Sequence, residues 1–365
     1  MRPLETARRV DRLRARLADA AVDGLLVTHL TNIGYLTGFT GSAALLLVTA
    51  DDLLFVTDGR YGDQSTSQLA AAGVAARIEV TSDRQRQVIA AAVPAGCRLG
   101  LEAEHVSWAD HGRYVTEWFP AATVTPTTSL VEGLREVKDG GEVDRIRAAC
   151  RIADEAFAAV RGLLADRPTE REFGLELDTT MRRLGAADVS FETIVASGPN
   201  GARPHHRPDL RTVIDGDLVV VDFGALVDSY HSDMTRTVMV GEPTDTQRRM
   251  YEVVRAAQAA GAARVAPGVS ANAVDEACRD VIAEAGWGDA FTHGTGHGVG
   301  LDIHEAPRVA KTSTATLVQG HIVTVEPGVY LADHGGVRIE DTLVVTEDGA
   351  EALTLSPKTA SLAAA

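Results

Sequence analysis

The sequence predicts a mixed α/β fold, or more broadly α+β, that is divided into two domains. The chain has 365 residues, which is more than one ordinary hydrophobic core accommodates. Its first third alternates short, β-rich apolar runs with helical stretches. A segment rich in turn formers and charge, 125–142, then precedes a series of amphipathic helices. We therefore expect an N-terminal α/β domain over residues 1–132 and a second domain over residues 133–365.

The N-terminal domain should contain a helix followed by buried strands. The first twenty residues, MRPLETARRVDRLRARLADA, have the pattern of an amphipathic helix. Three short apolar runs have the length and composition of buried strands, namely 23–29, 43–50 and 52–60. Residues 62–72 and 105–119 favour helices, and Trp108, Val115 and Phe119 could share one helical face. This order indicates a mixed α/β layer.

The second domain should be built from two helix pairs. A long helix begins at about Glu142, because apolar residues recur after it at helical spacing. A second helix, near 169–184, starts with the capping-box pattern of Thr169 and Glu172. Helices near 245–265 and 270–285 repeat the arrangement. Each pair precedes glycine-rich strand material, so we expect a duplicated α/β unit.

The composition argues against several classes of protein. A formal net charge of −16 disfavours binding to nucleic acid or to an anionic membrane, since both attract basic surfaces. No apolar run approaches the roughly 20 residues of a membrane span, and the start of the chain lacks the apolar stretch of a signal peptide. The cysteines, Cys97, Cys150 and Cys278, are odd in number and far apart, so no disulfide framework is indicated. We expect a cytoplasmic protein.

Two aspartates should face each other on a hairpin over residues 217–240. A run of three valines predicts a buried strand that ends at Asp222, and Asp228 is typical of a reversal. If the loop consists of Val227 and Asp228, the register places Asp222 opposite Asp233, with Cβ atoms about 5 Å apart. Two carboxylates so close among apolar residues repel each other and are costly to bury. A cation should therefore lie between them.

Two glutamates have comparable apolar surroundings near the end of the chain. Glu326 follows alternate valines in a strand over 321–331. The segment 335–346 alternates along its length, so that Arg338 and Glu340 project from the same face of one strand. A glutamate without a partner is rare in such surroundings.

The segment HGTGHGVGLDIHEAP, 293–307, adds three histidines on a glycine-rich backbone. The glycines would let the backbone approach a metal while His297 points inward and His293 and His304 surround a substrate. The candidate metal ligands are thus Asp222, Asp233, His297, Glu326 and Glu340.

Four carboxylates carry a charge that two divalent cations neutralise. One imidazole among hard oxygen ligands suits Mn²⁺ or Co²⁺ better than a structural zinc site. Two such ions, about 3.5–4 Å apart, can hold a bridging hydroxide and polarise a carbonyl.

The order of these residues, and the motifs around them, resemble a known family. DFGALVDSYHSDMTRT, HGTGHGVGLDIHEAP, TVEPGVY and GVRIEDT are similar to motifs of the pita-bread metallopeptidases, above all of their proline-specific branch, aminopeptidase P and the Xaa-Pro dipeptidases (prolidases). NIGYLTGFTGS (32–42) and TDGRY (57–61) resemble the creatinase-type N-terminal domain of that branch. The resemblance covers nearly the whole chain. It implies a creatinase-like N-terminal domain followed by a pita-bread catalytic domain.

The resemblance also implies a role for each metal ligand. Asp222 should chelate one metal ion, and Asp233 and Glu340 should bridge both. His297 and Glu326 should bind the other ion. Glu326 should also accept a proton from the nucleophilic water and pass it toward the leaving proline nitrogen.

Further residues are implied to act on the substrate. His205, with His206 as an alternative, and His293 should line the substrate pocket. His304 should donate a hydrogen bond to the scissile carbonyl and stabilise the developing oxyanion. Arg338 should orient Glu340 or nearby acidic groups.

Two positions bear on specificity. Phe191 could belong to a small apolar pocket for the proline ring. Gly34 departs from the family pattern, because many relatives carry arginine between the Ile and Tyr of NIGYLTGF. If that arginine meets a substrate carboxylate or the partner subunit, its absence weakens the dipeptidase assignment. Relatives form dimers, so the resemblance also implies a homodimer.

The sequence therefore predicts a metal-dependent exopeptidase that hydrolyses the N-terminal Xaa-Pro bond of peptides, as aminopeptidase P does. The alternative is an Xaa-Pro dipeptidase restricted to dipeptides. A non-catalytic peptide-binding module of the same fold is disfavoured, because it has no reason to keep four buried carboxylates in register. The expected cofactor is a pair of Mn²⁺ ions, with Co²⁺ or Zn²⁺ as alternatives. Proline-containing peptides are the expected substrates.

Overall fold

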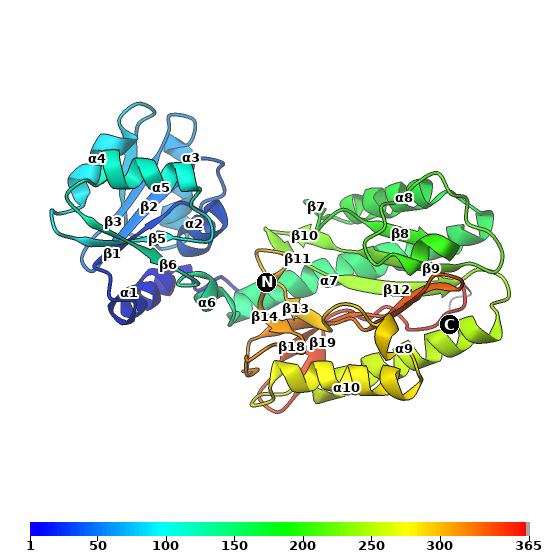
Figure 1. Ribbon diagram of the computed structural model, residues 1–365. Coiled ribbons are helices and arrows are strands. Elements are labelled where there is room, and N and C mark those ends of the chain that lie inside the picture. The colour runs from blue at the N-terminus through cyan, green and yellow to red at the C-terminus, as the bar shows by residue number, and fades with distance from the viewer. Residues whose placement is uncertain (363–365) are drawn as a thin grey trace. The chain divides into compact units, whose positions relative to one another are not determined.

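In the computed structural model, which describes residues 1–362, the chain separates into two units (Figure 1). One unit comprises Pro3–Arg135, and the other comprises Met1–Arg2 together with Glu136–Ala365.

A six-stranded sheet forms the centre of the N-terminal unit. Its strands are β1 (Gly24–Val27), β2 (Ala44–Thr49), β3 (Leu53–Thr57), β4 (Arg77–Val80), β5 (Arg98–Glu102) and β6 (Thr123–Thr127), in the order β4-β3-β2-β1-β5-β6. The pairs β1–β2 and β2–β3 are antiparallel, and the others are parallel. The three strands expected at 23–29, 43–50 and 52–60 are confirmed as β1, β2 and β3.

Helices cover this sheet. They are α1 (Arg9–Asp19), α2 (Leu30–Thr37), α3 (Gly62–Ala71), α4 (Gln85–Ala92), α5 (Trp108–Arg113) and α6 (Glu132–Arg135), with a 3₁₀ turn at Thr6–Arg8. The expectation that Trp108, Val115 and Phe119 share one helical face is wrong. Trp108 is 88% exposed whereas Phe119 is buried. The cause is a π-helical turn, Tyr114–Trp118, which follows α5 and changes the helical period.

Two helix pairs cover the C-terminal unit. They are α7 (Gly140–Val160) with α8 (Glu170–Arg183), and α9 (Asp245–Arg264) with α10 (Ala271–Glu284). The expected capping box of Thr169 and Glu172 is present at the start of α8. A second capping box, formed by Asp139 and Glu142, starts α7 slightly earlier than the periodicity alone indicated. Short 3₁₀ segments complete the helical elements at Arg161–Asp166, Gly198–Ala202 and Gly288–Ala290.

The strands of this unit lie between the two helix pairs (Figure 1). They are β7 (Asp188–Val189), β8 (Ile194–Ser197), β9 (Leu218–Phe223), β10 (Ala225–Val227), β11 (Tyr230–His231), β12 (Met234–Met239), β13 (Gly296–Gly298), β14 (Glu305–Val309), β15 (Ile322–Val325), β16 (Gly328–Leu331), β17 (Gly335–Arg338), β18 (Asp341–Val345) and β19 (Ala350–Ala352). Among the described residues they form sheets of the orders β11-β10-β7, β12-β9-β8, β14-β13-β15-β18-β19 and β16-β17.

Each helix pair encloses a hydrophobic core against its own strands. Phe157 of α7 packs on Phe223 of β9 with ring centroids 5.2 Å apart, in a core shared with α8 and β12. Val254 of α9 and Cys278 of α10 belong to a second core with Val323 and Val325 of β15. The metal-ligand candidates are carried by strands and strand ends between these two cores.

The expected register of the aspartate hairpin is wrong by two residues. Val227 pairs with Tyr230, and Asp222 pairs with Thr235 instead of Asp233. The two-residue loop is therefore Asp228 and Ser229, whose φ angles are 47° and 69°. A two-residue hairpin turn of this kind needs positive φ at both central residues, which a β-branched valine resists.

The strand expected over 335–346 is interrupted. β17 ends at Arg338 and β18 begins at Asp341, so Glu340 lies in the break between them. β15 and β18 pair as far as Val325 and Asp341. Glu326 and Glu340 therefore leave the paired strands at the same end.

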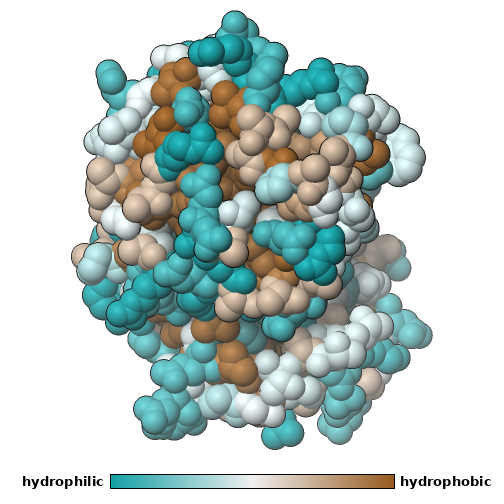
Figure 2. Space-filling view, turned by 90° about the vertical axis from the view of Figure 1, so that its left-hand side faces the viewer, coloured by the Kyte–Doolittle hydropathy of each residue, from teal (hydrophilic) through white to brown (hydrophobic). Residues whose placement is uncertain are grey.

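The surface is mixed in character. Figure 2 shows hydrophilic residues interspersed with smaller groups of hydrophobic ones on the face turned to the viewer. The large hydrophobic side chains with the highest exposure come from separate parts of the chain and include Trp108, Leu175, Leu210 and Leu355. Across residues 1–362, no helix combines the length and the apolar character needed to span a bilayer.

Candidate active site

The five candidate metal ligands converge in the C-terminal unit. Nε2 of His297, in β13, lies 3.5 Å from Oδ2 of Asp233 and 3.5 Å from Oε1 of Glu326. Ligand atoms of Asp233, His297 and Glu340 all lie within 4.8 Å of one another. Asp233 precedes β12, and Glu326 directly follows β15.

Asp222 joins this group through Thr235 and Arg338. Thr235 is the cross-strand partner of Asp222, and its Oγ1 donates to Oε2 of Glu340 at 2.7 Å. Nη2 of Arg338 is 2.6 Å from Oδ2 of Asp222, and its Nε donates to Oγ1 of Thr235 at 3.0 Å. Arg338 therefore contacts Asp222 directly, and it reaches Glu340 through Thr235.

The carboxylates strongly perturb one another. Burial, followed by the charge of Asp222, raises the pKa of Glu340 to about 8. Burial and the charge of Glu340 likewise raise the pKa values of Asp233 and Glu326 well above their usual range. Carboxyl groups held together in this way tend to keep protons unless a cation replaces them. The cluster therefore favours a strong positive charge at its centre.

The hydrogen bonds leave ligand atoms available for metal ions. Among residues 1–362, Oδ1 of Asp222 and Oε1 of Glu340 are buried without a hydrogen-bonding partner. The Nδ1–H of His297 donates to the carbonyl oxygen of Gly298 at 3.0 Å, which directs the lone pair of Nε2 toward the carboxylates. Burial lowers the pKa of His297 to about 4, so the imidazole is neutral and able to ligate near pH 7. The site residues fit divalent metal ions.

The glycines around His297 serve close strand packing. A Cβ atom on Gly296 would overlap the carbonyl group of Thr324, and one on Gly298 would overlap the carbonyl of Ala306. Both neighbours are backbone and cannot swing aside. The sequence-based explanation, in which glycines let the backbone approach the metals, therefore needs correction. They let β13 approach its neighbouring chain segments while His297 points to the carboxylates.

Two exposed histidines lie beside the cluster. The ring of His304 meets that of His297 edge to face, with centroids 4.4 Å apart. Burial lowers the pKa of His304, and the charge of His205 lowers it further. His205 is exposed, whereas His206 is buried and its Nε2 lies 2.8 Å from Oε2 of Glu170. Of the two neighbouring histidines, His205 is thus the one that faces the other site histidines.

His293 is connected to the cluster by Tyr330. Its Nδ1–H donates to the carbonyl of Gly294, and its Nε2 lies 2.8 Å from the hydroxyl of Tyr330. The same hydroxyl accepts from Nη1 of Arg338 at 3.0 Å. Burial, followed by the charge of Arg338, lowers the pKa of His293 to about 4. A neutral His293 therefore accepts a hydrogen bond within a chain that leads to Asp222.

Sequence reasoning missed several residues that position the site. Thr235 could have been suspected, because it lies two residues after Asp233 on an alternating strand. In the sequence, Asp275 and Arg279 of α10 are distinguished only by their helical spacing, which did not indicate a role in the site. The buried carboxylate of Asp275 accepts hydrogen bonds from the backbone and hydroxyl of Thr295. Arg279 is paired with Asp275 and donates to the carbonyl of His293. Phe191 is half-buried between β7 and β8, and its role stays a prediction.

Comparison with known proteins agrees with this geometry. Residues 144–347 match the model of metallopeptidase family M24, and residues 9–137 match the creatinase/prolidase N-terminal domain. The chain is 39% identical over 354 residues to the uncharacterized peptidase YqhT of Bacillus subtilis, which covers 96% of this chain and 98% of that protein.

Solved structures give the same result. The structure titled Xaa-Pro dipeptidase from Bacillus anthracis superposes with a TM-score of 0.92 at 36% identity, covering 97% of this chain and 99% of the other. X-Pro aminopeptidase from Thermotoga maritima gives a TM-score of 0.87 at 33% identity, covering 96% and 99%. The expected creatinase-type N-terminal domain and pita-bread catalytic domain are confirmed. The chain belongs to metallopeptidase family M24, within its proline-specific branch.

Proposed function

We propose that this protein hydrolyses the bond between an N-terminal residue and a following proline, as an aminopeptidase P-like exopeptidase. The observation that carries the proposal is the buried convergence of four carboxylates and Nε2 of His297, in which two carboxylate oxygens have no hydrogen-bonding partner among the described residues. A peptide-binding module would gain nothing from such a cluster, which is unfavourable without cations.

Two divalent ions would be held by Asp222, Asp233, His297, Glu326 and Glu340, with Asp233 and Glu340 shared between them. When bound, such ions lower the pKa of water and polarise a carbonyl group. The donor set is rich in carboxylate oxygen and has one imidazole, which supports Mn²⁺ in preference to Co²⁺ or Zn²⁺. Arg338 holds Asp222 in place through its 2.6 Å ion pair.

The remaining residues would handle the proton and the peptide. Glu326 would accept a proton from the attacking water and deliver it to the proline nitrogen. His304 would donate to the scissile carbonyl as charge develops on its oxygen, while His205 and His293 would line the substrate pocket. Phe191 would contribute to the proline pocket. A homodimer and a cytoplasmic location belong to the same proposal, and light scattering and cell fractionation would test them.

Substitutions separate metal binding from substrate activation. In Glu340→Ala, hydrolysis of Ala-Pro-Ala should be abolished and bound metal should fall, because a shared ligand is lost. Asp348→Ala, an exposed carboxylate between β18 and β19, is the matched control and should behave as wild type. His304→Ala should keep its metal yet lose about 10²–10³ in turnover, as expected for an oxyanion donor. Unchanged turnover in Glu340→Ala would refute the proposed metal centre.

The dipeptidase alternative is favoured by the likeness to the B. anthracis structure, whose title names an Xaa-Pro dipeptidase. Gly34 points the other way if the arginine of many relatives meets a substrate carboxylate. A comparison of Ala-Pro with Ala-Pro-Ala, after EDTA treatment and then with Mn²⁺ restored, distinguishes the two. Turnover of Ala-Pro-Ala supports the aminopeptidase. Turnover of Ala-Pro alone assigns the dipeptidase.

A further inference from the structure

A second group of side chains that could hold a metal ion lies in the N-terminal unit, far along the sequence from the proposed catalytic residues. His29 follows β1, His105 lies three residues beyond β5, and Glu132 begins α6. Because β1 and β5 are parallel neighbours, their carboxyl ends meet at one edge of the sheet. One ligand atom from each of the three residues lies within 4.8 Å of the other two.

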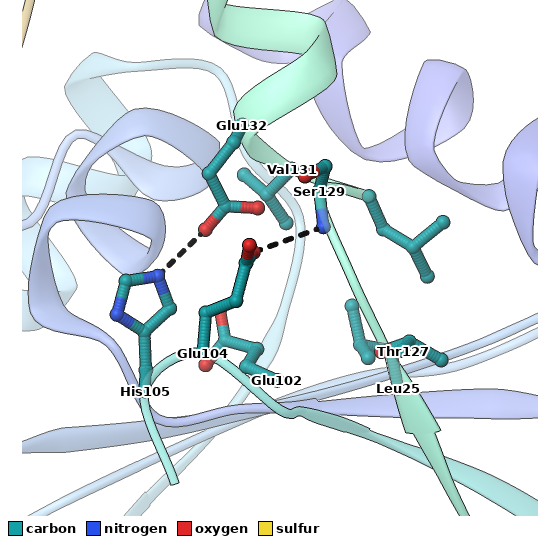
Figure 3. Close-up of a pocket in the computed structure, with 9 residues that line it drawn as sticks. Leu25, Glu102, Glu104, His105, Thr127, Ser129, Val131 and Glu132 are labelled. Carbon is teal, nitrogen blue, oxygen red and sulfur yellow. Dashed lines mark hydrogen bonds and ion pairs between the residues drawn. The ribbon is translucent and has the colours of Figure 1, made fainter. Parts of the chain in front are cut away.

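The side chains of this group are already in contact. The imidazole rings of His29 and His105 stack with centroids 3.7 Å apart and an interplanar angle of 6°. Nε2 of His105 lies 2.8 Å from Oε1 of Glu132. Figure 3 marks this contact with a dashed line. A simple histidine–glutamate ion pair would need only one imidazole. The second imidazole brings the set to two nitrogen ligands and one carboxylate.

The surroundings hold these residues in place and are acidic. Glu102 accepts hydrogen bonds from the backbone N–H of Thr28 and of His29, which fixes the start of α2. A small surface pocket beside His105 is lined by Glu102, Glu104 and Glu132. In Figure 3 the side chains of Glu104 and Glu132 lie on the same side of His105. Three carboxylates around one small pocket favour a cation.

The charge of Glu132 is maintained within this cluster. Its burial acts to raise the pKa, but hydrogen bonds from Asn32 and from its own backbone outweigh burial and lower it. Nδ2 of Asn32 donates to Oε1 of Glu132 at 2.6 Å and to Oε1 of Glu102 at 2.8 Å. Glu132 is therefore an ionised and oriented carboxylate at neutral pH.

We propose that His29, His105 and Glu132 bind one divalent first-row transition metal ion, for which Zn²⁺ is the suitable probe. Two imidazoles and one carboxylate are a common set for such ions, with water in the remaining position. Metal bonds of about 2.0–2.1 Å require the donor atoms to close to about 3.4 Å. The stacked rings must then fan apart, and exposed His105 has room to move. The bound ion would join the ends of β1 and β5 to α6.

Zinc content of the full-length protein tests the proposal independently of the catalytic site. After equilibrium dialysis against micromolar Zn²⁺, wild type should retain about one Zn²⁺ per chain more than His105→Ala. Glu132→Gln should lose the same ion, and hydrolytic activity should be unchanged in both. His111→Ala is the matched control, because His111 lies in α5 and stacks on Trp108. It should keep the wild-type zinc content.

An anomalous difference map from a Zn²⁺-soaked crystal locates the ion. A peak between His29, His105 and Glu132, with the two rings no longer parallel, is the expected result. Equal zinc content in wild type and His105→Ala, or the absence of a peak at these residues, overturns the proposal. Circular dichroism of each variant ensures that an unfolded chain is not mistaken for a lost site.

Discussion

At the scale of single residues, a buried ion pair joins Lys138 to Glu305, beside His304 in the sequence. Nζ of Lys138 lies 2.5 Å from Oε1 of Glu305, and the two side chains are 1% and 8% exposed. Glu305 is the neighbour of His304 in sequence, while the backbone N–H of Lys138 donates to the carbonyl of Gly320. The pair therefore connects the start of the C-terminal unit to the residue proposed to bind the scissile carbonyl.

Removal of one member of this pair should be more harmful than removal of both. Lys138→Met should lower the free energy of unfolding by about 3–5 kcal/mol, because it leaves the carboxylate of Glu305 buried without its cation. The double variant Lys138→Met with Glu305→Gln should regain most of this stability. Urea denaturation of the three proteins measures both effects. A double variant no more stable than the single one would show that the pair itself is not the cause.

A second buried residue should make stability depend on pH. Burial, followed by the charge of Lys138, lowers the pKa of His321 from 6.5 to about 4. Between pH 6.5 and about pH 4 the unfolded chain binds more protons than the folded one, so the free energy of unfolding falls as the pH is lowered. At pH 5 the loss amounts to about 2 kcal/mol for this one residue. His321→Asn should therefore lose less stability than wild type between pH 7.5 and pH 5, as measured by urea denaturation. Parallel pH profiles would contradict the assignment.

At the scale of elements, the aspartate hairpin depends on the conformation of its turn. Ser229 has a φ of 69°, a value that serine tolerates and that a β-branched residue resists. Ser229→Val should cost about 1–2 kcal/mol of stability. Ser229→Asn is the matched control, because asparagine adopts this conformation readily, and its melting temperature should equal that of wild type. If Ser229→Val and Ser229→Asn have the same melting temperature, the conformation of the turn does not determine the register of β9 and β12.

The same hairpin shows where sequence reasoning succeeds and where it fails. The capping box of Thr169 and Glu172 was predictable, because it depends on residues three positions apart. The candidate ligands were recognisable in the sequence, because acidic residues are conspicuous among apolar strand residues, and the structure brings them together. The register of the hairpin could not be predicted, because it depends on which two residues of the turn take positive φ angles. Thr235 and Tyr330 also escaped prediction, because their contacts with Glu340 and His293 join distant parts of the chain.

At the scale of the whole molecule, the two units should respond differently to metal. The catalytic ligands all belong to Glu136–Ala365, whereas His29, His105 and Glu132 belong to Pro3–Arg135. Calorimetry should therefore resolve separate transitions, as is common for chains with more than one domain. Hard oxygen ligands prefer Mn²⁺, while a site with two imidazoles prefers Zn²⁺. Mn²⁺ should thus stabilise the C-terminal unit, and Zn²⁺ should stabilise the N-terminal unit as well.

Mn²⁺ added after EDTA treatment should raise only the transition of the C-terminal unit. At 100 times the dissociation constant, one bound ion contributes about 2.7 kcal/mol, which corresponds to a shift of about 5–10 °C for a unit of this size. Zn²⁺ should in addition raise the transition of the N-terminal unit, and His105→Ala should remove that second shift alone. A single transition that Mn²⁺ shifts as a whole would mean that the units unfold together. An N-terminal transition unmoved by Zn²⁺ would contradict the second site.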